Sequence, residues 1–179
     1  TYEAAGGQIC ENLLKAGFSV SKYVFHEKQL EPDEYAVGSA MMHFDPNWQF
    51  ILAVGSGVIN DIGKIMASIS KKPYLIFGTA PSMDGYASAT SSMERSGLKI
   101  SLPSKAPEAI IGDLDILVNA PLKMLSSGIG DMLAKYISIC EWRISHLING
   151  EYYSEEIEKD TKYRADYLQG IDDFLKEEK

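Results

Sequence analysis

The chain has 179 residues, 45% hydrophobic and 23% charged, which is the composition of a globular protein with a sizeable core. The net charge is −8, and without a basic stripe this argues against a nucleic acid as the main partner. No run approaches the roughly 18 apolar residues of a membrane span, and the first residues are not a signal peptide. Cys10 and Cys140 fall on predicted helices far apart in sequence, so we expect reduced core thiols in a cytoplasmic protein.

The first fifty residues alternate between helical and extended patterns. A helix capped by Thr1 is expected over residues 1–16, with Gly17 as its stop signal, followed by a strand over 18–25. A second helix should begin near Pro32 and end at residues 45–47. This order places a helix, a strand and a helix before the strongest signal in the chain.

That signal is a run of apolar residues at 51–54 that leads directly into Gly55 and Gly57 and then into a helical pattern up to Ser70. A buried strand, a glycine turn and a helix N-terminus together form a phosphate-binding device, because free N–H groups and the positive end of the helix dipole face an anion. Asn60 stands where a dinucleotide fingerprint would have its third glycine. A tight turn without a ligand is therefore an equally good interpretation of these residues alone.

The remaining patterns predict a strand, a polar loop, a hairpin, a second strand region and a long helical segment. In order, these cover residues 73–77, 78–88, a region around 95–97 that ends at 103, 109–118, and 121–150. The helical segment should be interrupted at Gly128 and Gly130, and apolar residues between Ile157 and Phe174 could form one more helical stripe. The alternation of strands and helices up to about residue 120 predicts an α/β fold with a parallel sheet and crossover helices.

Polar residues of the loop after the second strand are candidates for ligand binding. Asp84 lies in this loop with the hydroxyls of Thr79, Ser82 and Ser88. Ligands of open α/β sheets bind beyond the carboxyl ends of the strands, so this loop and the glycine turn are expected at one crevice. A turn in which these side chains bond their own backbone explains the same residues equally well.

Asp131 is the strongest candidate for a metal ligand. It is expected to open a long helix, where it would either interact with the helix dipole and Lys135 or bind a cation through its carboxylate. His146 lies 15 residues later, which is roughly 22 Å along a continuous helix and too far to share an ion. His26 and His43 show no ligand spacing, so all three histidines are expected to be structural or surface residues.

Four motifs together carry a resemblance to a known family. They lie, in family-like order and spacing, at residues 55–61, 79–88, 128–131 and 141–153. The set resembles the sn-glycerol-1-phosphate dehydrogenases of the iron-containing alcohol dehydrogenase and dehydroquinate synthase superfamily. The resemblance implies a dehydroquinate synthase-like fold: a Rossmann-like nucleotide-binding α/β domain over residues 1–120, without its first strand, and the start of an all-helical metal and substrate domain over 121–179.

The same resemblance assigns roles to individual residues. A cofactor, NAD or NADP, would contact Gly55, Gly57, Val58, Ile59, Asn60, Asp61, Thr79, Ala80, Pro81, Ser82 and Ser88. Asp84 would contact the substrate, and Asp131 would be a catalytic residue that binds both the substrate and a divalent metal (zinc, nickel or iron). The two histidine ligands of the family have no counterpart here, so we expect the chain to be part of a longer enzyme, truncated at both ends.

The implied reaction is a metal-dependent hydride transfer that interconverts sn-glycerol 1-phosphate and dihydroxyacetone phosphate, within phospholipid metabolism in the cytoplasm. The partners would be a phosphorylated polyol or ketone and further copies of the chain, with no nucleic acid and no membrane span. Three alternatives stay open. They are a glycerol dehydrogenase, a dehydroquinate-synthase-like enzyme, and a nucleotide-binding fragment without turnover.

Overall fold

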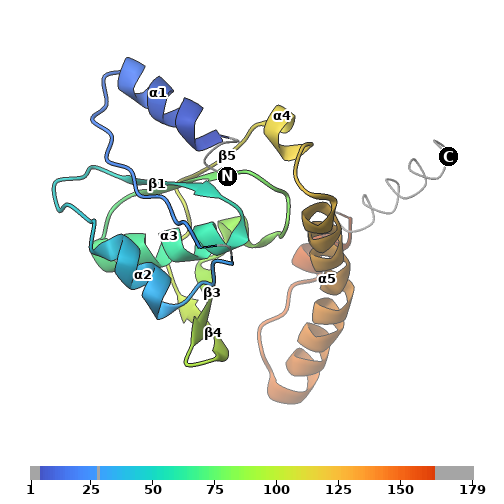
Figure 1. Cartoon of the computed structure of the whole chain (residues 1–179). Helices are drawn as coiled ribbons and strands as arrows, with labels where there is room; N and C mark the ends of the chain where they lie inside the picture. Colours follow the sequence, from blue (N-terminus) through green and yellow to red (C-terminus); the bar gives the residue numbers. More distant parts are fainter. Residues whose placement is uncertain (1–4, 28, 164–179) are drawn as a thin grey trace. The chain divides into compact units, whose positions relative to one another are not determined.

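The computed structural model describes residues 5–27 and 29–163, drawn in colour in Figure 1. The chain divides into two compact units. The sheet unit comprises Thr1–Pro81 and Gly85–Met124, and the helical unit comprises Ser82–Asp84 and Leu125–Lys179. Within the described ranges, no helix combines the length and the apolar character that crossing a bilayer requires.

The sheet unit contains the predicted parallel sheet and the predicted hairpin. The parallel strands lie in the order β1-β2-β5, and the hairpin strands β3 and β4 pair antiparallel through Ser96 and Gly97, which both have positive φ. The strands are β1 (Ile51–Gly55), β2 (Tyr74–Gly78), β3 (Thr90–Arg95), β4 (Leu98–Pro103) and β5 (Ala109–Gly112). The two predictions are confirmed because each depends on a local pattern, an apolar run before a crossover helix or a turn between two short strands.

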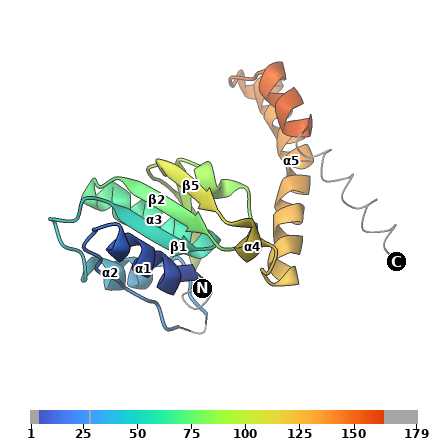
Figure 2. The same cartoon turned by 90° about the horizontal axis from the view of Figure 1, so that it is seen from above.

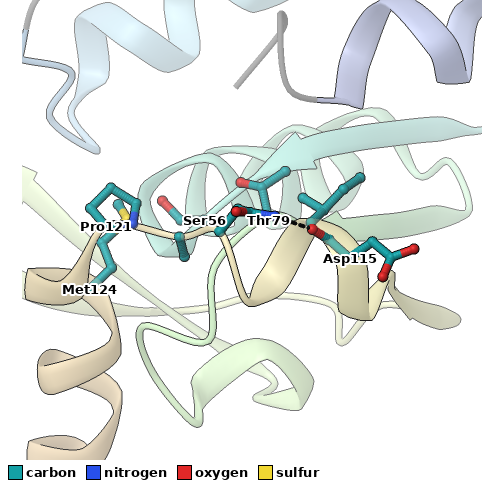
Figure 3. A pocket seen from close by; sticks show the side chains of 8 residues that line it. Ser56, Thr79, Asp115, Pro121 and Met124 are labelled. Atoms are coloured by element: carbon teal, nitrogen blue, oxygen red, sulfur yellow. Dashed lines mark hydrogen bonds between the residues drawn. The ribbon is translucent and has the colours of Figure 1, made fainter.

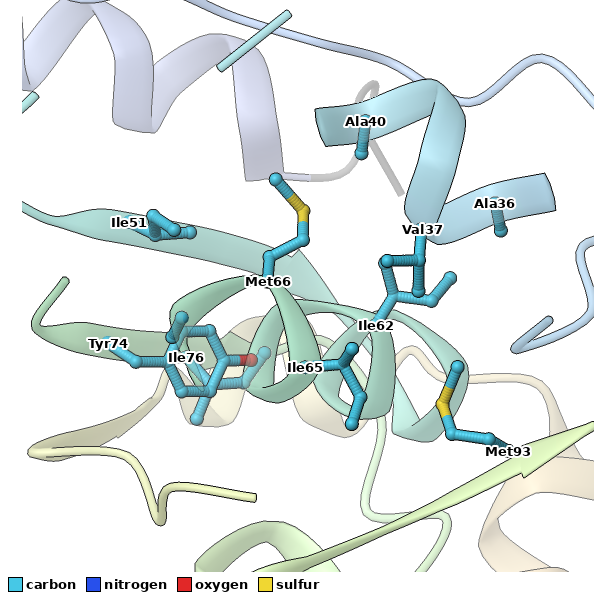
Figure 4. Packing of buried hydrophobic residues seen from close by; sticks show 11 residues of the cluster. Ala36, Val37, Ala40, Ile51, Ile62, Ile65, Met66, Tyr74, Ile76 and Met93 are labelled. Atoms are coloured by element: carbon cyan, nitrogen blue, oxygen red, sulfur yellow. The ribbon is translucent and has the colours of Figure 1, made fainter. Parts of the chain in front are cut away.

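Helix α3 (Gly57–Ser70) is the centre of the sheet unit. Its residues 60–67 are all buried, because the helix packs on β1 and β2, on hairpin strand β3 and on α2 (Glu34–Met41) (Figures 1 and 2). Asp33 caps α2 by accepting the N–H of Ala36 at 2.8 Å. The buried apolar side chains around α3 are drawn in Figure 4; the cluster contains Ala36, Val37, Ala40, Ile51, Ile62, Ile65, Met66, Ala67, Tyr74, Ile76 and Met93.

Gly63 is where α3 approaches β2 most closely. A Cβ there would lie 2.6 Å from the ring of Tyr74, which is fully buried and cannot move aside. We expect Gly63→Ala to lower the free energy of unfolding by about 2 kcal/mol through overpacking. The matched control is Gly38→Ala in α2, where a Cβ meets no atom within 4 Å and should stabilise the helix by up to about 1 kcal/mol. Urea unfolding of both variants measures the two changes in the free energy of unfolding, which should have opposite signs. A Gly63→Ala protein as stable as the wild type would contradict the expected clash.

The segment over residues 18–25 is not a strand, so this prediction is wrong. Its aromatic side chains pack on the sheet unit individually: Phe18 meets Phe50 edge to face at 5.9 Å, and Tyr23 stacks on His43 at 4.6 Å. The alternating pattern therefore reflects side-chain packing and not strand pairing. The preceding helix, α1 (Gly7–Lys15), ends before Gly17 as predicted, with φ of 88° at this glycine, whereas the expected cap at Thr1 lies outside the described residues.

The strand region over 109–118, predicted to be broken at Asp113 and Asp115, contains two elements and its strand ends at the first predicted break. Strand β5 ends at Gly112, and Asp113 then caps the short helix α4 (Leu114–Leu117) by accepting the N–H of Asp115 at 2.9 Å. The capping aspartate explains why the extended pattern stops there, since an N-cap side chain satisfies a helix N–H.

Helix α5 (Leu122–Asn149) runs without interruption through Gly128 and Gly130. The predicted breaks are wrong, because a glycine costs only about 1 kcal/mol inside a helix and 28 residues of helix outweigh two of them. Asp131 consequently lies in the interior of α5 and does not open a helix. Both cysteines are free as expected, but neither is a core thiol, since Cys10 is half-buried and Cys140 on α5 is exposed.

In the helical unit, an ion-pair cluster joins α5 to the helical residues 155–163. The carboxylate of Glu158 is 4% exposed and lies 2.6 Å from Arg143 Nη2 and 2.5 Å from Lys162 Nζ. Hydrogen bonds from Lys162 and Arg143 outweigh burial and lower the pKa of Glu158. Of the apolar stripe expected near the end of the chain, Ile157 and Tyr163 are exposed, and its remaining members lie outside the described residues.

This cluster predicts an acid-sensitive helical unit. Because the folded pKa of Glu158 lies below its unfolded value near 4.5, the ionised pair stabilises the fold above that pH and loses its effect as the pH falls through the folded value. We expect amide hydrogen exchange in residues 155–163 to accelerate below about pH 4.5. Glu158→Gln should remove this pH dependence, whereas Glu156→Gln, at an exposed neighbour, should keep it. An identical acid response in both variants would contradict the assignment.

Candidate functional site: a glycine-lined sheet edge and a paired carboxylate

The glycine turn joins β1 to α3 in the sheet unit. Ser56, between them, has extended backbone (φ −99°, ψ −159°), and its hydroxyl does not cap the helix. The first N–H groups of a helix have no carbonyl partner within it, so the turn presents donors and the positive end of the dipole together. A Cβ at Gly55 would lie 2.6 Å from the Cβ of Ile59, so glycine is needed for α3 to begin this close to the strand.

Two residues of the predicted cofactor set turn their side chains inward. Asn60 is fully buried: its Oδ1 accepts the hydroxyl of Tyr74 at 3.0 Å, and its Nδ2 donates to the carbonyl of Tyr86 at 3.5 Å. Burial raises the pKa of Tyr74, which keeps this hydroxyl protonated as a donor. Asp61 is buried too and pairs with Lys64. Their predicted contact with the cofactor stays a prediction. In the structure these two side chains are bonded inside the sheet unit, next to the glycine turn.

A row of three glycines lies across the carboxyl edge of the sheet. Gly55, Gly78 and Gly112 are the last residues of β1, β2 and β5, and they are in register, Gly55 opposite Gly78 and Gly78 opposite Gly112. Gly55 and Gly78 are both buried, since the side chain of Ile59 lies over the first and that of Tyr86 over the second. Only the first of the three was singled out from the sequence; the others become visible once the strand ends are aligned.

A pocket of about 360 Å³ opens at this edge of the sheet unit (Figure 3). It brings together Ser56 of the glycine turn and Thr79 of the loop that follows β2. The N–H of Thr79 donates to the carbonyl of Gly55 at 3.0 Å. The other wall comes from the segment after β5, including Asp115 and Asn119, and Asn119 Nδ2 donates to the carbonyl of Asp115 at 2.7 Å. This wall was not singled out from the sequence; applying the carboxyl-end rule to a strand that ends at Gly112 would have found it.

The other predicted cofactor residues of the sheet unit have defined places. Val58 and Ile59 are half-buried in the first turn of α3, and Pro81 is exposed. Ala80 is buried, and its carbonyl accepts the hydroxyl of Tyr86 at 2.7 Å. Ser88 Oγ lies 2.8 Å from Thr90 Oγ1 and accepts the N–H of Thr90 at 3.1 Å. Their roles stay predictions, and the structure places them in one unit with the pocket.

The helical unit brings together the two predicted substrate residues, Asp84 and Asp131. Asp131 Oδ2 accepts the backbone N–H of Asp84 at 2.9 Å, and the carboxylate of Asp84 lies 2.7 Å from Lys135 Nζ. Lys135, expected as a partner of Asp131, thus pairs with Asp84, while Ser82 is half-buried in the same short segment. The side chains of Asp84 and Lys135 are 33% and 29% exposed, so this cluster is open to a hydroxyl group or a cation.

These groups do not form a complete metal centre. Among residues 5–27 and 29–163, no three His, Cys, Asp or Glu side chains are placed to hold a metal ion. A catalytic transition-metal site draws on about three protein ligands, so Asp131 could contribute only one of them. His43 stacks on Tyr23, and His146 Nδ1 lies 2.6 Å from the carbonyl of Glu151, as expected for structural histidines.

The parallel sheet with crossover helix, its glycine-lined carboxyl edge and the helical segment that follows define a Rossmann-like α/β protein. The sequence matches the model of the iron-containing alcohol dehydrogenase family over residues 1–121. The chain therefore belongs to the iron-containing alcohol dehydrogenase family.

Curated relatives sharpen this placement. A glycerol-1-phosphate dehydrogenase [NAD(P)+] of Halalkalibacterium halodurans is 34% identical over 165 residues, which are 90% of this chain and 41% of the relative. The enzyme of the same name from Pyrococcus furiosus is 34% identical over 155 residues, covering 87% of this chain and 44% of its own. The chain thus spans less than half the length of the curated relatives it matches.

Solved structures agree on the fold. The glycerol dehydrogenase of Schizosaccharomyces pombe superposes with a TM-score of 0.68 and 27% identity, over 76% of this chain and 34% of that one. An iron-containing alcohol dehydrogenase of Thermotoga maritima reaches a TM-score of 0.62 at 17% identity, over 74% and 42% of the respective chains. The expected fold class, α/β of the dehydroquinate synthase-like type, is confirmed.

Proposed function

We propose that the protein is a nicotinamide-dependent and metal-dependent oxidoreductase that interconverts sn-glycerol 1-phosphate and dihydroxyacetone phosphate. The observation that carries this proposal is the similarity over 87–90% of the chain to curated glycerol-1-phosphate dehydrogenases, combined with a pocket at the glycine-lined edge of the sheet. We further propose a cytoplasmic, homo-oligomeric enzyme in phospholipid metabolism.

In this proposal the sheet unit binds NAD or NADP. The phosphates lie against the first turn of α3, where unpaired N–H groups and the helix dipole favour an anion. The absence of a side chain at Gly55 lets α3 begin close to the strand, which brings the first N–H groups of the helix to this edge of the sheet. Ser56 and Thr79 supply hydroxyls along the pocket wall.

The helical unit supplies the substrate carboxylates. Asp84 is oriented by Lys135 and by its own N–H bond to Asp131, so it can accept a substrate hydroxyl. Asp131 offers one carboxylate ligand to a divalent metal (zinc, nickel or iron), and the further ligands have to come from outside the described residues.

The test is turnover on sn-glycerol 1-phosphate and on glycerol, each with NAD and with NADP. The second substrate is included because the Schizosaccharomyces pombe neighbour is a glycerol dehydrogenase. Preferred turnover of the phosphate ester supports the proposal. Preferred turnover of glycerol would replace it, and the absence of both would favour a dehydroquinate-synthase-like enzyme or a protein that only binds the nucleotide.

Asp84→Ala is expected to lower turnover by about 100-fold while dinucleotide affinity changes less than about twofold, because the carboxylate is assigned to the substrate and not to the cofactor. Steady-state kinetics and calorimetry with NADH measure the two quantities separately. The control is Asp45→Ala, which removes an aspartate that accepts the N–H of Asn47 at 2.8 Å in another loop and should leave turnover unchanged. A collapse of dinucleotide binding in Asp84→Ala would make this loop part of the cofactor site.

A further inference from the structure

Helix α3 turns three polar side chains toward the interior of the sheet unit. Asn60, Asp61 and Lys64 are 0%, 9% and 1% exposed. A charged group in such a place is stable only when it is paired and hydrogen-bonded. The partners of the Lys64 ammonium therefore indicate the structural role of this buried charge.

Lys64 makes two bonds, and one of them leaves the helix. Its Nζ lies 3.0 Å from Asp61 Oδ1, one turn earlier on α3. The same Nζ donates to the carbonyl of Thr90 at 2.6 Å, at the start of β3. The ion pair thus attaches the first two turns of α3 to the hairpin.

The chain just before Thr90 is the loop that carries Ser88. Thr90 donates its N–H to Ser88 Oγ at 3.1 Å, and the two hydroxyls lie 2.8 Å apart. Asn60 lies one helical turn before Lys64 on α3, and it holds the same loop through its bond to the carbonyl of Tyr86. A continuous series of contacts therefore runs from the helix that begins at the glycine turn to Ser88.

We propose that Lys64 is a positioning residue of the dinucleotide site: from the buried side of α3 it fixes Thr90, and through Thr90 it fixes Ser88 relative to the glycine turn. This inference rests on the proposed function, because it treats Ser88 and the turn as two parts of one cofactor site. Lys64 itself touches no ligand, since its ammonium is buried and bonded to the protein. An exposed lysine could be lost without consequence, whereas this one connects the helix that follows the glycine turn to the loop that carries Ser88.

The decisive variant removes both charges together, Asp61→Asn with Lys64→Met. Removing the ammonium alone would leave a buried carboxylate unpaired, whereas a neutral pair of similar volume is tolerated in many buried sites. The net charge of the chain stays the same, so long-range attraction of the cofactor does not change. The variant removes the ion pair between Lys64 and Asp61 together with the bond from Lys64 to Thr90. Asp61→Asn with Lys64→Leu repeats the test with a shorter apolar side chain should methionine prevent folding.

The control is Lys72→Met. Lys72 Nζ also donates to a distant carbonyl, that of Pro46 at 2.6 Å, but on the exposed surface and away from the pocket. Both proteins and the wild type are compared in thermal unfolding, in calorimetric titration with NADH and NADPH, and in hydrogen exchange at the amide of Thr90.

We expect the double variant to unfold cooperatively near the wild-type temperature, yet to bind the preferred dinucleotide about tenfold more weakly and to exchange the Thr90 amide about tenfold faster. Lys72→Met should match the wild type in affinity and in Thr90 exchange. A folded double variant with wild-type affinity and wild-type exchange would overturn the proposal. If the wild type bound neither dinucleotide, the proposed function would fail, and unchanged Thr90 exchange would still show separately that Lys64 anchors nothing.

Discussion

Gly57→Val is expected to weaken dinucleotide binding by about 100-fold, as if two hydrogen bonds to charged oxygens were lost. Gly57 is the first residue of α3, where the proposed phosphate contacts are made by backbone. A β-branched side chain would occupy the space in which a phosphate approaches the first N–H groups of the helix. The affinity is measured by calorimetry with NADH and NADPH, and circular dichroism reports the helical content.

The matched control for this substitution is Gly38→Val. Gly38 is also a helical glycine of the sheet unit, and a Cβ there meets no atom within 4 Å. The control separates the cost of valine in a helix from the cost of blocking a ligand. Equal affinities of the two variants would remove the glycine turn from the cofactor site.

In a protein that carries the complete metal site, Asp131→Asn is expected to remove the metal and to lower turnover by at least about 100-fold, because groups that merely support a metal ligand already cost 10–100-fold when lost. The amide keeps the size of the side chain, and its oxygen can still accept the N–H of Asp84, as Asp131 Oδ2 does at 2.9 Å. Only the negative charge that offsets the cation disappears. Elemental analysis of the purified protein, beside an assay with sn-glycerol 1-phosphate, measures both losses.

The control is Asp113→Asn, the same change of charge at the cap of α4, where asparagine caps as well as aspartate. It should retain metal and turnover. Normal metal content in Asp131→Asn would reduce Asp131 to a residue that only holds the Asp84 loop. The 179-residue chain by itself should bind divalent metal weakly, since its described residues place no three ligand side chains together.

Short-range patterns predicted most of the sheet unit. The apolar run into Gly55, the helix up to Ser70 and the hairpin at Gly97 depend on neighbours within a few residues, and all three are present. The prediction of a strand over 18–25 was wrong because it depends on contacts with distant residues. Its alternation is compatible with a strand, but whether another strand lies alongside is decided by tertiary packing, and here aromatic contacts such as Phe18 on Phe50 replace the ladder.

The candidate site was predictable as residue types and less so as an arrangement. The glycine turn and Thr79 do meet at one pocket, because the carboxyl-end rule follows from parallel pairing. The position of Asp131 inside α5 was missed, since two glycines resemble a helix start when the apolar pattern on both sides is ignored. The hydrogen-bond partners of buried groups could not be predicted from the sequence. No local pattern pairs Lys64 with Thr90, which is 26 residues away.

The row of Gly55, Gly78 and Gly112 bears on how the cofactor preference of such a protein can evolve. A glycine has no side chain with which to attract or repel the additional phosphate that distinguishes NADP from NAD. In the proposed function these positions offer no group that discriminates between the two dinucleotides, so discrimination has to be made by side chains elsewhere. The preference can then drift from one cofactor to the other through surface substitutions, while the geometry of hydride transfer stays untouched.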